Sequence, residues 1–135
     1  MHSKKHFLKF WFPVIIYAII IFWVSSQQQP FGVEIEIVGL DKILHIIEYA
    51  ILGFLLARAF AGSSEKISIR DLVLITFIIG TLYGLTDEFH QHFTPGRVVS
   101  ILDLISDAIS SFLGAVIFKA LRKSPSGREH GPLNG

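Results

Sequence analysis

The sequence predicts an all-α membrane protein in which four transmembrane helices account for nearly the whole chain. Only 17% of the 135 residues are charged, against about a quarter in an average soluble domain, and the mean hydropathy is +0.56. Four apolar runs are each close to the ~20 residues that cross a hydrocarbon core. These runs are Phe7–Ser25, Ile43–Phe60, Leu72–Gln91 and Ile101–Leu121. Residues 1–123 are therefore expected to form a single domain, and residues 124–135 a disordered tail rich in Gly, Pro and Ser.

The first run is expected to be a helix kinked near Pro13, because proline removes a backbone hydrogen bond and clashes with the preceding turn. A cleaved signal peptide is the alternative, since the run has a basic start. Its apolar stretch is longer than that of a typical signal peptide, however, and no A-x-A-like site follows Val24-Ser25-Ser26. In the next connection, the alternating residues 33–37 allow a short interfacial strand or a re-entrant loop.

Basic residues are distributed unequally between the two sides of this arrangement. Only Lys42 and Arg97 fall on one side. The other ten of the twelve fall on the opposite side: Lys4, Lys5, Lys9, Arg58, Lys66, Arg70, Lys119, Arg122, Lys123 and Arg128. The positive-inside rule then predicts that both termini are cytoplasmic.

Several classes of function lack support in the sequence. The chain has no cysteine, which excludes disulfides, thiolate chemistry and cysteine-type zinc sites. It also lacks a P-loop, a G-x-S-x-G motif and a dinucleotide-binding fingerprint. The basic segments are explained by topology, so no nucleic acid is expected as a partner.

Polar residues recur at helical spacing on three of the four predicted spans, and each span carries them as one stripe. The stripes and the tight connection at 93–99 supply these candidate pocket residues: Asp41, His45, Glu48, Tyr49, Asp87, Glu88, Gln91, Arg97, Ser100, Asp103 and Asp107. Each stripe reaches about 10 Å into the outer half of the membrane, at ~1.5 Å per residue. Gly80, Gly84 and Gly114 continue the stripes inward, where small residues allow close helix packing. We therefore expect a polar pocket that opens outward above closely packed helices.

Ionisable groups near hydrocarbon are costly and by default indicate a functional site. Six carboxylates face two basic residues here, so some must be protonated or a cation must bind. His45, Glu48, Asp87 and Asp107 could coordinate a divalent cation. Alternatively, the candidates for catalytic acid–base chemistry are His45, Glu48, Asp87, Glu88 and Asp103. No diagnostic metal-site spacing decides between these readings. Arg97, beside the Pro95-Gly96 turn, is expected to pair with nearby carboxylates.

Two segments resemble the VanZ-like membrane proteins of bacteria. The first is Asp41-Lys42-x-x-His45-x-x-x-Tyr49-x-x-Leu52-Gly53. The second is Asp87-Glu88-x-x-Gln91-x-Phe93-x-Pro95-Gly96-Arg97-x-x-Ser100-x-x-Asp103, and Ser25-Ser26-Gln27 is also similar. Asp107 and Ser110 depart from the family pattern, which has asparagine and glycine there. The resemblance implies a multi-pass protein of the bacterial cytoplasmic membrane that acts in the cell envelope. It also implies a link to glycopeptide antibiotic resistance, since the family's namesake is associated with low-level teicoplanin resistance, but it supplies no reaction.

Three functions are compatible with these features. The first is binding of a lipid headgroup, a lipid-linked envelope precursor or a protein partner in the outward pocket. The second is an enzyme of the outer leaflet, a hydrolase or transferase that uses acid–base or metal-assisted chemistry. The third, cation-coupled transport, would need an oligomer, because the polar stripes do not continue past Leu52, Gly80 and Gly114.

Overall fold

The computed structural model describes residues 2–27, 40–64, 66–95 and 100–122, and all the regular secondary structure in these ranges is helical. The helices are α1 (His2–Phe10), α2 (Phe12–Ser25), α3 (Leu40–Ser63), α4 (Ile69–Gln91) and α5 (Ile101–Leu121). Helices α3, α4 and α5 are each long and apolar enough to cross a membrane, and the bent pair α1–α2 would make a fourth span. The predicted all-α membrane fold is thus confirmed, while the orientation of its termini stays a prediction.

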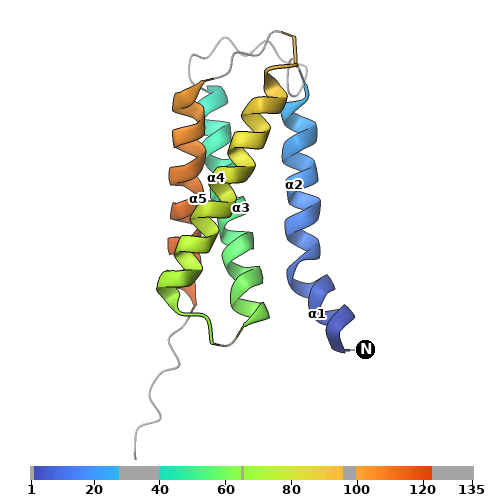
Figure 1. The fold of residues 1–135 in the computed structure, drawn as a ribbon, viewed down its shortest axis with the longest axis vertical. Coiled ribbons are helices and arrows are strands. Elements are labelled where there is room, and N and C mark those ends of the chain that lie inside the picture. Colours follow the sequence, from blue (N-terminus) through green and yellow to red (C-terminus); the bar gives the residue numbers. More distant parts are fainter. Residues whose placement is uncertain (1, 28–39, 65, 96–99, 123–135) are drawn as a thin grey trace, which may run out of the picture.

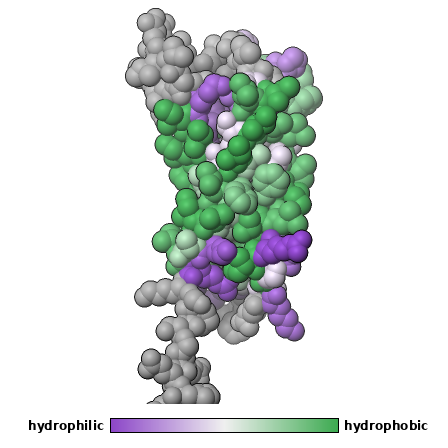
Figure 2. Space-filling view, turned by 90° about the vertical axis from the view of Figure 1, so that its left-hand side faces the viewer, coloured by the Kyte–Doolittle hydropathy of each residue, from purple (hydrophilic) through white to green (hydrophobic). Residues whose placement is uncertain are grey.

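Helices α3, α4 and α5 pack together, and α2 lies along one side of them (Figure 1). Successive long helices run in opposite directions, so the end of α3, the start of α4 and the end of α5 lie together. We call this the basic end, after Arg70, Lys119 and Arg122. The opposite end, which carries Asp87 and Asp103, is the acidic end. Figure 2 shows a broad hydrophobic band between hydrophilic side chains at the two ends.

The first span bends at Trp11, where α1 and α2 meet at 42°. The predicted kink is therefore present, two residues before the predicted position. Pro13 has no N–H to donate to the carbonyl of Lys9, four residues earlier. The Nη1 atom of Arg58, on α3, donates to that carbonyl instead, at 3.1 Å. This contact joins the bend to α3.

Two more contacts hold α1 against the end of α3. A ring nitrogen of His6 lies 2.6 Å from the carbonyl oxygen of Gly62, and the indole of Trp11 donates to the Ser63 hydroxyl at 2.8 Å. A Cβ atom at Gly62 would collide with the ring of Phe10. The absence of a side chain there lets α1 lie directly on α3.

Glycines bring α3 and α5 into backbone contact near the middle of the bundle and let α4 lie close to α5. A Cβ at Gly53 would collide with the backbone carbonyl of Ser111, and one at Gly114 with that of Ala50. A Cβ at Gly80 would strike the side chain of Ser111. The predicted close packing below the polar stripes is therefore confirmed.

Helix α4 begins three residues earlier than the predicted span. Ser68 caps it, because its hydroxyl accepts from the Asp71 N–H at 3.0 Å and donates to the Asp71 carboxylate at 2.7 Å. The proposed strand at 33–37, the tail at 124–135 and Gly96 of the predicted turn lie outside the described residues.

Candidate functional site

Helices α3, α4 and α5 meet around the side chain of Asp107, which is 0% exposed. A Cβ on Gly84 of α4 would lie 3.2 Å from the Asp107 side chain and 3.4 Å from the ring of Tyr49. Because Gly84 has no side chain, the carboxyl of Asp107 and the ring of Tyr49 occupy that space. Residues of all three predicted polar stripes therefore lie near this point, while the outward-opening pocket stays a prediction.

His45 of α3 is the hydrogen-bond partner of Asp107. Its Nδ1 atom lies 3.3 Å from Oδ1 of the carboxylate, and the imidazole side chain is 12% exposed. When the carboxylate is ionised it can only accept a hydrogen bond, and Nδ1 then carries the proton. The pair has the arrangement that orients a histidine for acid–base chemistry.

Tyr49 extends this group towards α2. Its ring is parallel to that of His45, with centroids 6.2 Å apart, and it also contacts the ring of Tyr83 on α4. The hydroxyl of Tyr83 donates to the carbonyl of Ala18 at 2.5 Å. A chain of three rings therefore runs from the site to α2.

Two further carboxylates lie on α4, one turn closer to its end. Asp87 is 2% exposed and accepts from the Gln91 amide at 3.1 Å. Glu88 is 4% exposed and accepts from the backbone N–H of Ser100 at 3.1 Å. Glu88 therefore links the end of α4 to the start of α5, and Ser100 acts through its backbone rather than its hydroxyl.

Some oxygen atoms of these buried carboxylates have no hydrogen-bond donor among the described residues. Oδ1 of Asp87, Oε1 of Glu88 and Oδ2 of Asp107 accept no hydrogen bond from any described residue. The buried hydroxyl of Tyr49 interacts with the Asp87 carboxylate but has no well-aligned hydrogen bond to a described residue. A buried polar atom without a partner typically costs about 1–3 kcal/mol, so each such atom needs an explanation. Their concentration in one layer distinguishes this region from an ordinary helix contact.

The remaining predicted residues are placed around this layer. Lys42 of α3 forms an ion pair with Asp103 of α5 at 2.9 Å, with side chains 45% and 15% exposed. The half-buried Glu48 interacts electrostatically with Tyr17 on α2 and with His45. Arg97 and the side chain of Asp41 lie outside the described residues, so their predicted roles stay predictions.

The proposed metal site is not assembled in the described part of the chain. No group of three His, Asp or Glu residues there has positions that could hold a metal ion. Of the predicted metal ligands, His45 is hydrogen-bonded to Asp107, while Glu48 also interacts electrostatically with Tyr17. The acidic residues are better described as a hydrogen-bonded layer.

Sequence reasoning missed the contacts that join α2 to this layer. The hydroxyl of Ser26 donates to the carbonyl of Phe22 at 2.7 Å and lies 2.8 Å from Nε2 of His90. Because the one hydroxyl proton goes to Phe22, the proton between Ser26 and His90 belongs to the imidazole. The His90 ring also lies against the Phe22 ring, with centroids 4.2 Å apart. The only available signal was the similarity of Ser25-Ser26-Gln27 to the VanZ-like pattern.

A small pocket reaches the acidic layer between α4 and α5. Its volume is about 270 Å³. Apolar side chains form most of its wall, with Glu88, His92 and Ser100 as the polar members; the others are Leu85, Phe89, Ile101 and Leu104. Glu88 can therefore be approached from the side of the bundle.

The fold and the site together define a helical membrane protein with a buried layer of carboxylates, histidine and tyrosine near one end. The family model described as VanZ/LLP1 matches residues 4–122, and the chain belongs to this family. The match includes every helix that contributes to the site. No curated protein and no solved structure matches the chain significantly.

Proposed function

We propose that the acidic end of this VanZ/LLP1-family protein binds the headgroup of an envelope lipid or lipid-linked envelope precursor that is rich in hydrogen-bond donors. One observation carries the proposal: Asp87, Glu88 and Asp107 are 0–4% exposed, and each has one oxygen that accepts nothing from a described residue. Ammonium, hydroxyl or amide groups of a headgroup would supply the donors. The predicted topology would put this end at the outer face of a bacterial cytoplasmic membrane.

The pocket between α4 and α5 supports an amphiphilic ligand. Its polar side is the Glu88 carboxylate, while Leu85, Phe89, Ile101 and Leu104 make its wall apolar. A headgroup entering beside Glu88 would leave its acyl or prenyl chain against these side chains, in contact with the surrounding hydrocarbon.

The test is ligand-dependent thermal stabilisation of the purified chain in detergent. Two probes are used: a polyprenyl-pyrophosphate-linked disaccharide pentapeptide, and phosphatidylethanolamine. Phosphatidylcholine, whose headgroup donates no hydrogen bond, is the comparison lipid. A donor-rich lipid should raise the melting temperature of the native chain, and Asp87→Asn or Glu88→Gln should abolish the rise. Asp71→Asn, a carboxylate at the basic end, is the matched control and should keep it. If no donor-rich lipid shifts the melting temperature more than phosphatidylcholine, the proposal fails.

The same proposal extends to the cell. Binding of a lipid-linked envelope precursor would connect this protein to glycopeptide susceptibility, which the family resemblance also implies. In cells, deletion of the gene should change teicoplanin susceptibility. Complementation with the native gene should reverse this change, and complementation with the Glu88→Gln variant, which has lost headgroup binding, should not.

A second candidate function is an enzyme of the outer leaflet, favoured by the His45–Asp107 pair at 3.3 Å. In that case Asp107 orients the imidazole and His45 moves a proton to or from the substrate. Lipid profiles of cells with His45→Gln separate the two functions. If the protein is an enzyme, one unmodified lipid species should accumulate in the His45→Gln cells. If it is a binding protein, the covalent composition of the lipids should stay unchanged.

A further inference from the structure

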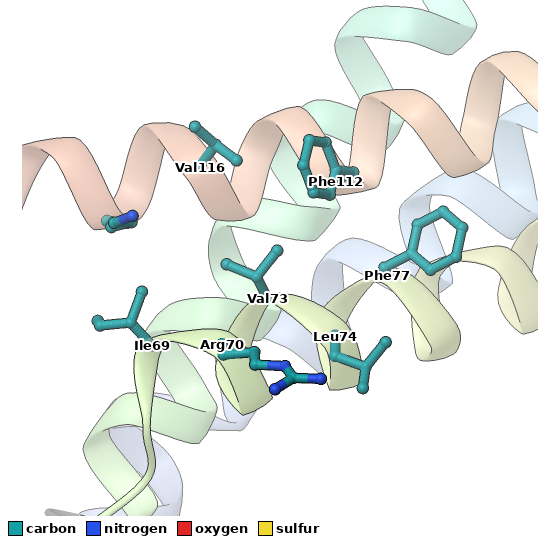
Figure 3. A pocket seen from close by; sticks show the side chains of 8 residues that line it. Ile69, Arg70, Val73, Leu74, Phe77, Phe112 and Val116 are labelled. Atoms are coloured by element: carbon teal, nitrogen blue, oxygen red, sulfur yellow. The ribbon is translucent and has the colours of Figure 1, made fainter.

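A second groove lies at the basic end of the bundle, between the first half of α4 and the second half of α5. Its volume is about 730 Å³, within the ~300–1,000 Å³ typical of ligand sites. Figure 3 shows Val73 of α4 pointing towards α5, with Phe112 opposite it on α5. Phe77 and Val116 also line the groove. Its interior therefore suits a hydrocarbon chain.

Two cations border this apolar groove at one end. Arg70 and Lys119 are the charged members of its lining, and both side chains are exposed. Arg70 is the second residue of α4 and Lys119 is two residues before the end of α5, so both lie at the basic end of the bundle. Neither cation forms an ion pair with another described residue; the ion pairs in this part of the chain join Lys42 to Asp103 and His45 to Asp107. Both cations remain available to an anion.

The length of the groove places the charged and apolar parts of a ligand at suitable depths. Phe77 lies seven residues along α4 from Arg70, and Phe112 lies seven residues along α5 from Lys119. At ~1.5 Å per residue, the groove extends about 10 Å from the cations into the hydrophobic band. An anionic headgroup at the surface and the first part of an acyl chain below it would match this pattern.

We propose that the groove between α4 and α5 is a binding site for an anionic glycerophospholipid of the leaflet at the basic end. Arg70 on α4 and Lys119 on α5 attract the phosphate at the rim of the groove, and one acyl chain lies between Val73, Phe77, Phe112 and Val116. This site is separate from the acidic end and does not depend on the function proposed there. Charge complementarity selects this occupant: a zwitterionic lipid fills the groove equally well but leaves the two cations without a net anionic partner.

The experiment uses the full chain in mixed micelles with phosphatidylglycerol and phosphatidylcholine of identical acyl chains. Native mass spectrometry counts each lipid retained by the protein as the phosphatidylglycerol fraction is titrated. The native chain should retain phosphatidylglycerol preferentially. The R70Q/K119Q variant should weaken this binding about 30-fold, from the typical contribution of two basic residues at an anionic surface. The K66Q/R122Q variant removes two exposed cations that do not line the groove, and its binding should change less than about threefold.

Further variants address the apolar part and the alternative occupants. Val73→Phe fills the groove and should reduce retention of both lipids, while free glycerol phosphate should not compete with phosphatidylglycerol. Equal retention of the two lipids by the native chain, or equal losses in R70Q/K119Q and K66Q/R122Q, would overturn the proposal. The proposal would also be overturned if the native chain is a dimer and Val73→Phe dissociates it without changing the amount of bound lipid. In that case a second copy of the chain would occupy the groove.

Discussion

The two ends of the bundle use polar groups in opposite ways. At the basic end, His6 and Arg58 reach backbone carbonyls of Gly62 and Lys9, so polar side chains satisfy the backbone where the first span bends. At the acidic end, oxygens of Asp87, Glu88 and Asp107 are buried without a partner among the described residues. Most of the buried polar atoms without a described partner thus lie at the acidic end, although the Thr76 and Ser111 hydroxyls elsewhere in the bundle are also without one.

The apolar packing differs between the ends as well. Leu56, Ala57, Ala59, Leu72 and Ala115 form buried apolar contacts in the basic half of the bundle. The buried residues of the acidic half are mainly polar, with Ile21 and Tyr49 as the large apolar exceptions. We therefore expect close packing to stabilise the basic half, and the buried polar groups of the acidic half to contribute less to stability. The four predictions that follow test this difference, from the largest expected effect to the smallest.

The largest effect is expected where the two halves join. In Gly114→Val, the added side chain meets the backbone of Ala50 and Phe54, which cannot move aside as a flexible side chain can. Helices α3 and α5 must then move apart at this crossing, at a cost of about 3 kcal/mol. Thermal melting followed by size exclusion in detergent should show loss of folded monomer. Ala120→Val, on the exposed face of the same helix, should melt like the native chain; a stable Gly114→Val protein would contradict the close crossing.

The next effect concerns the acidic layer alone. His45→Ala should lower stability by about 3 kcal/mol, because it removes the one described partner of the buried Asp107 carboxylate. The double change His45→Leu with Asp107→Leu should recover most of the loss, since apolar replacement of a buried pair is often neutral or stabilising. Reversible melting of both variants measures the difference. If the double variant is as unstable as His45→Ala, the acidic layer is needed for folding and the comparison between the ends is wrong.

A smaller effect is expected at the bend of the first span. Arg58→Ala removes the donor to the Lys9 carbonyl, which Pro13 leaves without its usual partner, and should cost about 1.5–3 kcal/mol locally. Amide hydrogen exchange should increase in α1 while α4 and α5 stay protected. Arg58→Lys keeps a cationic donor beside Phe10 and is expected to retain part of the protection. Uniform exchange across all helices after Arg58→Ala would show that the contact supports the whole bundle instead.

The smallest effect is expected where α2 meets the end of α4. Ser26→Ala removes a hydroxyl bonded to both Phe22 and His90, and should lower stability by about 1 kcal/mol. Ser25→Ala is the matched control, because the adjacent Ser25 hydroxyl is buried without a described partner and its removal should be neutral or slightly stabilising. The difference in melting temperature between the two alanine variants isolates the His90 contact. A larger loss in Ser25→Ala than in Ser26→Ala would contradict this assignment.

The spacing of polar residues predicted much of the candidate site, because helical periodicity puts residues three and four apart on one face. His45, Asp87 and Asp107 were each assigned to a stripe, and the structure brings these stripes together around Gly84. Spacing could not predict which partner each residue takes. Lys42 reaches Asp103, and Glu88 reaches the backbone of Ser100, because of how α3, α4 and α5 are offset along their axes.

The sequence by itself determined the all-α membrane class, the approximate limits of the long helices, the bend near Pro13 and the position of polar residues on each helix. Hydrophobic length and helical period are local properties, so a single chain segment is enough to read them. Only the tertiary structure decided that His45 pairs with Asp107, that Ser26 joins His90, and that Arg70 and Lys119 border one groove. These relations depend on the rotation and offset of helices distant in sequence, which side-chain packing across the bundle sets.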